Sequence, residues 1–178
     1  MQRIPCYEPG SGNEKSDIAL AEMSKMFGGY TPNFHKVLAN SAPVVTAFEA
    51  MRRTLQGTKL RAIEREIIAL EVSRRSDCEY CLAAHSKFAR VFKMPEADLQ
   101  ALRSGRPMAD TRNALVQRAA QRLIDTQGRL PDSELEEFRS AGLSDGELME
   151  IIAVIGWYVL STYANNLAYT EVDAYWTS

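Results

Sequence analysis

The chain has 178 residues, of which 46% are hydrophobic and 25% charged, and its formal net charge at pH 7 is −2. Its length and composition are those of one ordinary globular domain with a single core. The slightly negative net charge argues against a dedicated nucleic-acid-binding protein, because such proteins typically have an excess of basic residues. We therefore expect a single domain over residues 1–178, with a flexible start over residues 1–13.

The start of the chain and its longest apolar stretch indicate where the protein resides. Residues 1–7 lack the basic-then-apolar pattern of a secretory signal peptide. The longest apolar stretch, Ile151–Leu160, is shorter than the roughly 18 residues that a membrane span needs. We expect a cytoplasmic protein outside the membrane, where a closely spaced cysteine pair is more often catalytic, redox-sensing or metal-binding than structural.

Helical periodicity and helix caps recur along the chain, whereas the alternation typical of strands is nearly absent. Proline, glycine and acidic or hydroxyl caps mark the ends of the predicted helices. The predicted helices are Ser16–Phe27, Pro32–Leu38, Pro43–Leu55, Lys59–Ser76, Cys78–Phe92 with Asp77 as N-cap, Pro95–Gly105, Asp110–Gly128, Asp132–Ala141, and a last long helix from Ser144 to Thr170. Short connections between many helices predict an all-α fold, a compact antiparallel helical bundle.

The residues that indicate chemistry are Cys78, Cys81 and His85, which follow the predicted break at Ser76 and Asp77. Positions i, i+3 and i+7 share one helix face, so both sulfurs and the imidazole project the same way. Free N–H groups and the positive end of the helix dipole favour a thiolate in the first turn. His85, one turn beyond Cys81, can accept its proton. Together these features predict a thiol–disulfide redox centre.

Two other interpretations of these three residues stay open. Buried cysteine and histidine side chains are often inert parts of a core. All three are also zinc ligands, although a fourth ligand would have to come from elsewhere in the chain. We interpret Cys6 as a spare thiol and His35 as a structural or surface residue. Trp157, Tyr158 and Tyr163 are expected in the core or at a subunit interface, and Asn165 and Asn166 are expected to close a pocket or an interface.

The segment from Glu66 to His85 resembles the core of the carboxymuconolactone decarboxylase / alkylhydroperoxidase D superfamily. That core has a glutamate, eleven intervening residues and then C-x-x-C-x-x-x-H, and Glu66, Cys78, Cys81 and His85 match it position for position. The similar region covers about residues 44–92. The resemblance implies an alkylhydroperoxidase D-like helical bundle, assembly into trimers or hexamers, and a peroxidase in which Glu66 and His85 form a proton relay for the cysteine pair.

One residue departs from the alkylhydroperoxidase D pattern. The family has a relay histidine just before the second cysteine, whereas this chain has Tyr80, as in the peroxidase-related branch. A tyrosine can donate a hydrogen bond but is a poor base near neutral pH, because its reference pKa is about 10. The decarboxylase branch lacks the cysteine pair, so the resemblance disfavours lactone decarboxylation.

We therefore predict a thiol-dependent peroxidase that reduces an alkyl hydroperoxide and has Glu66, Cys78, Tyr80, Cys81 and His85 as its catalytic residues. A thiolate attacks the peroxide, a Cys78–Cys81 disulfide forms, and an external dithiol or protein reductant restores the thiols. The dipole argument favours Cys78 as the attacking thiol and the spacing to His85 favours Cys81; we take Cys81 as peroxidatic and Cys78 as resolving. No nucleotide or flavin is expected, because no glycine-rich phosphate loop is present, and no metal is expected, because the chain has no second paired-ligand motif. The alternatives are a protein or lipoyl disulfide reductase or electron carrier, and a non-catalytic zinc- or ligand-binding oligomer.

Overall fold

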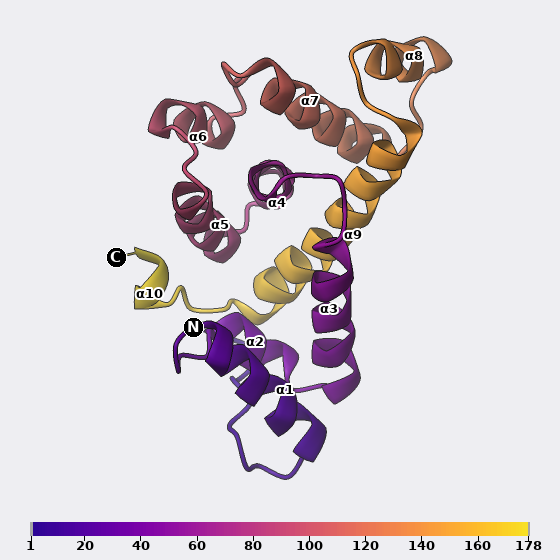
Figure 1. The fold of residues 1–178 in the computed structure, drawn as a ribbon. Helices are drawn as coiled ribbons and strands as arrows, with labels where there is room; N and C mark the ends of the chain where they lie inside the picture. The colour runs from indigo at the N-terminus through magenta and orange to yellow at the C-terminus, as the bar shows by residue number, and fades with distance from the viewer. Residues whose placement is uncertain (1, 178) are drawn as a thin grey trace.

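The computed structural model describes residues 2–177 and shows an all-helical protein (Figure 1). The helices are α1 Glu14–Met26, α2 Asn33–Leu38, α3 Ala42–Leu55, α4 Ala62–Arg75, α5 Glu79–Val91, α6 Glu96–Arg103, α7 Thr111–Thr126, α8 Asp132–Ser140, α9 Asp145–Ala168 and α10 Ala174–Thr177. The described residues contain no β-strand, and this confirms the predicted all-α class.

Helix α4 lies at the centre of the bundle and is surrounded by α5, α6, α7 and α9 (Figure 1). Apolar residues occur on more than one face of this helix, and Ile67, Ile68 and Leu70 are fully buried. Because its apolar residues cover more than one face, this helix is stable only when neighbouring helices cover it on several sides, which explains its central position. Because α4 and α5 pack along each other, residues of both helices can meet in one site.

Helix α9 is the longest element, with 24 residues. By length and composition alone it could cross a membrane, since its most apolar window has a mean hydropathy of 1.3. In the structure it packs against α2, α3, α4, α5 and α7, and in Figure 1 it runs from α8 at one end to α2 at the other. The predicted capping box at its start is present, because Ser144 and Glu147 bond reciprocally.

The N-terminal end of the chain folds back onto α9, and the C-terminal end folds back onto α5, which holds the cysteine motif. The backbone N–H of Arg3 donates to the carbonyl of Ala168 at 2.7 Å, at the end of α9. Helix α10, which the sequence analysis does not predict, packs against α5 and buries Trp176. The C-terminal residues therefore form part of the wall around the site.

The start of α5 differs by one residue from the prediction. Asp77 is not the N-cap; it has a left-handed backbone, with φ 50°, and it ends α4. The N–H groups of Asp77 and Cys78 donate to the carbonyls of Arg74 and Ser73, which is the Schellman arrangement. Cys78 takes the N-cap position of α5. The same turn thus closes one helix and opens the next, and it places Cys78 at the junction.

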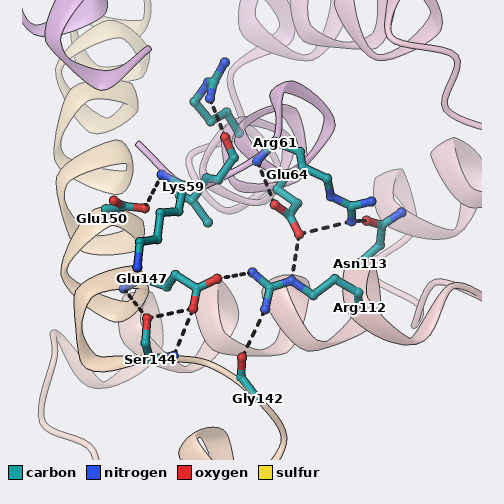
Figure 2. Close-up of polar contacts among 11 residues, drawn as sticks. Lys59, Arg61, Glu64, Arg112, Asn113, Gly142, Ser144, Glu147 and Glu150 are labelled. Atoms are coloured by element: carbon teal, nitrogen blue, oxygen red, sulfur yellow. Dashed lines mark hydrogen bonds and ion pairs between the residues drawn. The ribbon is translucent and has the colours of Figure 1, made fainter. Parts of the chain in front are cut away.

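A buried carboxylate ties α4 to α7 and α9, as Figure 2 shows. Glu64 is 1% exposed and accepts hydrogen bonds from Arg112 Nε at 2.8 Å and from the Arg61 guanidinium at 3.1 Å. Burial opposes its charge, but these two arginines outweigh burial and lower the pKa of Glu64. Arg112 also contacts Glu147 at 2.5 Å, and Arg61 contacts Asn113 at 2.8 Å. We call these five residues the Glu64 cluster.

Candidate active site

The two cysteines of the C-x-x-C motif lie together at the first turn of α5. The Sγ atom of Cys78 accepts a hydrogen bond from the backbone N–H of Cys81 at 3.3 Å. The two Sγ atoms are 2.6 Å apart, and the residues are 1% and 2% exposed. Because a disulfide bond is about 2.05 Å long, a small side-chain movement is enough to close it.

Negative charge is distributed unequally between the two sulfurs. Hydrogen bonding with Cys81 lowers the pKa of Cys78 against the opposing effect of burial, and the backbone N–H groups at the start of α5 lower it further. Burial raises the pKa of Cys81 well above its ordinary value, and the neighbouring Cys78 raises it further. The pair therefore places its first negative charge on Cys78 and keeps a proton on Cys81.

Glu66 of α4 and His85 of α5 form a second pair next to the cysteines. His85 Nδ1 lies 2.8 Å from Glu66 Oε2, and the imidazole ring packs edge-on against Tyr158 with 4.7 Å between ring centroids. The carboxylate fixes the ring orientation and occupies Nδ1, so Nε2 is the nitrogen that can exchange a proton with a reacting group. Two of the predicted relay residues thus meet in the structure.

A cavity of about 100 Å³ lies beside Cys81 and His85, and of the two cysteines it is Cys81 that lines it. We call it the apolar cavity. Its wall is mainly aromatic and includes Phe27, Phe34, Phe48, Phe88, Trp157 and Trp176. A volume of this size accommodates a molecule of a few heavy atoms or one small ring. Such a wall favours a small organic ligand over a highly charged one.

Tyr80 connects the cavity wall to the C-terminal segment. Its hydroxyl donates to Asp173 Oδ2 at 2.5 Å and accepts a hydrogen bond from Trp176 Nε1 at 2.9 Å. Burial and then the charge of Asp173 raise the pKa of Tyr80, so the phenol stays protonated. The position that carries a relay histidine in alkylhydroperoxidase D proper therefore holds a hydrogen-bond anchor for α10 here.

His35 is buried, so the prediction that it could be a surface residue is wrong. It is 7% exposed, lines the apolar cavity and has Nε2 3.4 Å from Glu49 Oε1. Burial opposes the charge on Glu49, but His35 and Arg52 outweigh it and lower the pKa of that carboxyl. The short helix α2 brings His35 to the cavity, which neither its periodicity nor its neighbours in sequence indicate.

Asn165 of α9 contacts the cysteine pair directly. Its Nδ2 donates to Cys81 Sγ at 3.3 Å, and a contact from Ser161 one turn earlier adds to the polar environment of that sulfur. Asn166 donates to the carbonyl of Ser76 at 2.6 Å and so holds α9 against the turn before α5. Both asparagines were predicted at a pocket or an interface, but their helical spacing does not indicate the contact with Cys81.

The remaining candidates supply no reacting group to this arrangement. Cys6 Sγ lies 3.8 Å from Asn33 Oδ1 on α2, apart from the cysteine pair. Trp157 and Tyr158 are buried in the cavity wall, whereas Tyr163 is exposed. Residues 2–177 contain no group of three or more histidine, cysteine, aspartate or glutamate side chains arranged to hold a metal ion.

Three structures share the fold over nearly their whole length. The chain is similar to an alkylhydroperoxidase AhpD core, an uncharacterized peroxidase-related protein from Ralstonia eutropha JMP134, with a TM-score of 0.85 and 20% identity over 98% of this chain and 94% of that chain. A peroxidase-related protein from Silicibacter sp. TM1040 gives a TM-score of 0.79 and 22% identity over 97% and 91% of the two chains. A cysteine-to-alanine variant of the debrominase Bmp8 in complex with 2,3,4-tribromopyrrole gives a TM-score of 0.78 and 15% identity over 99% and 95%.

The sequence comparisons point to one family. No curated protein matches the chain. Residues 42–123 match the carboxymuconolactone decarboxylase family, and this segment contains Glu66, both cysteines of the motif and His85. The matched segment agrees with the predicted resemblance to the carboxymuconolactone decarboxylase / alkylhydroperoxidase D superfamily, and the solved structures share the helical fold.

Proposed function

We propose that the protein is a thiol-dependent peroxidase that reduces a small organic hydroperoxide. One observation carries the proposal: Cys81 and His85 line the same apolar cavity, and the sulfur of Cys78 lies 2.6 Å from that of Cys81. A nucleophile, a proton carrier and a resolving thiol therefore surround one small space.

The oxidative half-reaction uses Cys81 first and Cys78 second. Cys81 Sγ attacks one oxygen of the hydroperoxide and the O–O bond breaks, so that sulfur is oxidised to a sulfenic acid. His85 accepts the thiol proton and gives it to the leaving alkoxide, which departs as an alcohol; Glu66 stabilises the imidazolium. The Cys78 thiolate then attacks Cys81 Sγ, forming the disulfide and expelling hydroxide, which is protonated to water.

The reductive half-reaction returns two electrons from an external dithiol or protein thiol. One thiolate of the reductant forms a mixed disulfide, its second thiol displaces the enzyme sulfur, and both cysteines return to their reduced forms. The cysteine pair is the only redox group that this cycle requires. The cavity volume of about 100 Å³ limits the substrate to a small hydroperoxide, and its aromatic wall favours one with an apolar substituent.

The test is a thiol count by mass on reduced protein before and after one equivalent of tert-butyl hydroperoxide. We expect the loss of two thiols within one turnover, mapped to a Cys78–Cys81 disulfide. With Cys78→Ser we expect a sulfenic acid on Cys81, trapped by dimedone, and with Cys81→Ser no rapid reaction. If Cys81→Ser kept the wild-type rate, the roles of the two cysteines would be reversed; if both thiols survived, the peroxidase proposal would be wrong.

The aromatic cavity wall favours a second candidate, the reductive removal of halogen from a small aromatic ring. The debrominase Bmp8, which has the same fold, is described in complex with a brominated pyrrole. In such a reaction two thiols deliver two electrons, the carbon–halogen bond becomes carbon–hydrogen, halide leaves and the disulfide forms. Halide release from a bromopyrrole or bromophenol, coupled to loss of two thiols and absent with Cys81→Ser, would support this candidate over peroxide reduction.

We further propose that the working form is a cytoplasmic homo-oligomer, a trimer or hexamer. Exposed apolar side chains on α9, Met149, Ile152, Tyr163 and Leu167, support this proposal, because soluble monomers rarely present several such residues on one helix. Light scattering coupled to size-exclusion chromatography tests it. A mass of one chain at micromolar concentration would contradict it.

A further inference from the structure

A second, polar pocket reaches the cysteine pair from another side. It has a volume of about 520 Å³ and lies where the turn between α4 and α5 faces the end of α9. Its lining includes Asp77, Cys78, Glu79, Asn165, Tyr169 and Thr170. Of the two cysteines it is Cys78 that lines this pocket, whereas Cys81 lines the apolar cavity. Tyr80 and Asn165 belong to both walls and separate the two spaces.

Two buried polar atoms of this pocket have no partner among the described residues. They are the Oδ1 atom of Asn165 and the Oγ1 atom of Thr170. Asn165 is 3% exposed and Thr170 is 8% exposed, so both side chains are more than nine-tenths buried. A buried polar group without a partner costs about 1–3 kcal/mol. Groups of this kind that line an open pocket indicate a ligand that completes their hydrogen bonds.

The polar pocket favours a ligand rich in N–H groups and not strongly negative. It lies between the C-terminal ends of α4 and α9, whose two negative dipole ends outnumber the one positive end, at the start of α5. The exposed carboxylates of Asp77 and Glu79 stand at its rim. The Oδ1 atom of Asn165 can only accept a hydrogen bond, and the hydroxyl of Thr170 can donate to a carbonyl. A secondary amide, with one N–H and one C=O, matches this pair.

We propose that the polar pocket is the docking site for the reductant, and that the reductant is a dithiol carried on a neutral or basic peptide segment, which attacks Cys78. This inference rests on the proposed function, because it assigns the partner of the same cysteine pair. The apolar cavity is about five times smaller (100 against 520 Å³) and carries no acidic rim, so it does not suit a peptide. Substrate and reductant thus reach the two sulfurs from different sides.

A peptide thiolate attacks Cys78 Sγ, a peptide–Cys78 disulfide forms, and Cys81 leaves as a thiolate that takes a proton from His85. The second peptide thiol loses its proton and attacks the peptide sulfur of the mixed disulfide. Cys78 leaves as a thiolate, and the peptide ends with an internal disulfide. Two electrons pass from the peptide to the enzyme pair.

The first test asks which sulfur the pocket presents to a peptide. The probe is the disulfide form of acetyl-Cys-Gly-Pro-Cys-amide, and the variants Cys81→Ala and Cys78→Ala are made in a Cys6→Ser background so that one thiol remains. We expect the peptide adduct to form at least about tenfold faster on Cys78 than on Cys81. Equal rates, or a faster reaction at Cys81, would overturn the assignment.

The second test uses Thr170→Val, which removes the unpaired hydroxyl and keeps the side-chain shape. Thr54→Val is the matched control, because Thr54 lies on α3 and bonds the carbonyl of Ala50 on its own helix. Protein oxidised with diamide is reduced either by the peptide dithiol or by dithiothreitol. We expect the ratio of the two rates to fall about tenfold in Thr170→Val and to stay constant in the control.

Two outcomes would contradict the peptide assignment. One is a rate ratio that does not change in Thr170→Val; the other is a Glu-flanked peptide that reacts as fast as a Lys-flanked one at low salt, since the rim is acidic. Faster, Thr170-dependent reduction by dihydrolipoamide would replace the peptide by a lipoyl arm. Diamide forms the disulfide without any peroxide, so these tests remain valid even if the peroxidase proposal fails.

Discussion

Two groups of buried polar residues differ in how completely their hydrogen bonds are satisfied. In the Glu64 cluster, the carboxylate that is 1% exposed has three donors within 3.1 Å, and its own arginines contact further acceptors (Figure 2). Around the cysteine pair the buried atoms His35 Nδ1, Trp157 Nε1, Asn165 Oδ1 and Thr170 Oγ1 have no partner among the described residues. All four side chains line the apolar cavity or the polar pocket.

This difference distinguishes buried polar side chains that stabilise the fold from buried polar side chains that can bind a ligand. A buried charge that is fully paired stabilises its surroundings only as long as every partner stays in place. An unpaired buried group weakens the folded protein and is tolerated where a ligand can complete it. The two kinds of group should therefore respond in opposite ways when a partner atom is removed.

The largest effect on stability is expected from Arg112→Met. The substitution removes the donor to Glu64 at 2.8 Å and the contact with Glu147 while keeping most of the side-chain volume. Because Glu64 stays buried with only Arg61 as a charged partner, we expect a loss of about 3 kcal/mol in the free energy of unfolding. Denaturant unfolding measures it, with Arg118→Met, an exposed arginine of α7, as the control.

The same variant tests whether the two groups are independent. We expect the folded fraction of Arg112→Met to lose two thiols to one equivalent of hydroperoxide at the wild-type rate. A tenfold slower oxidation at full folding would show that the Glu64 cluster also positions the active site, so that the two groups are not independent.

Glu66→Gln should have the opposite effects to Arg112→Met: a large loss of oxidation rate and little loss of stability. It removes the charge that faces His85 Nδ1 at 2.8 Å but keeps a hydrogen-bonding side chain of the same shape. We expect the oxidation of Cys81 to slow by about a hundredfold, the usual range for a general acid–base pair, with little change in unfolding free energy. Stopped-flow measurement of thiol loss checks the rate. The pH profile discriminates a relay from a structural glutamate: only a relay role changes the profile together with the rate.

Three glutamates of α4 show how far the sequence could predict the site. Periodicity places Glu64, Glu66 and Glu71 equally near the apolar stripe, and all three are buried. Glu64 and Glu71 contact arginines, whereas Glu66 contacts His85. Glu64 and Glu71 also have an arginine three residues away, which spacing can indicate, but the contact of Glu66 comes from another helix, so only the family pattern identified Glu66.

Local signals predicted the helices well because caps and turn residues act within a few positions. The Ser144–Glu147 capping box is one example, and the proline and glycine boundaries are others. No chemical role was predicted for His35, Asn165 and Thr170, because their contacts are not local. Their roles depend on where α2 and the end of α9 lie against α5, and no local pattern encodes that packing.

The charge on Cys78 should depend on Cys81. In the folded protein the pKa of Cys78 is lowered below the ordinary value of about 9, chiefly by hydrogen bonding with Cys81. The folded chain therefore binds fewer protons than the unfolded chain between the two pKa values of this group. The contribution of the Cys78 thiolate to the free energy of unfolding is complete above about pH 9 and is lost as the pH falls through the lower, folded pKa of Cys78. The raised pKa of Cys81 acts in the opposite direction at higher pH.

Thiolate absorbance at 240 nm tests this dependence. We expect one thiolate of the reduced wild-type pair to titrate below pH 9, and Cys81→Ala to move that titration back toward about 9. Cys78→Ala should leave a thiol that titrates above 9, because burial alone keeps the pKa of Cys81 high. A wild-type pair with no titration below 9 would contradict the unequal charge distribution.

Thr170→Val should have the smallest effect on stability, and its sign tests whether the Thr170 hydroxyl serves the fold or a ligand. If the hydroxyl only served the fold, its removal would destabilise the protein as the loss of a hydrogen bond does, by about 1 kcal/mol. Since Oγ1 has no partner among the described residues, replacing it with a methyl group should instead leave the free energy of unfolding unchanged or raise it by up to about 1 kcal/mol. Thermal unfolding of the variant beside Thr54→Val measures the sign. A stable variant that is also slower with peptide dithiols would mean that the chain gives up stability at Thr170 to bind its reductant.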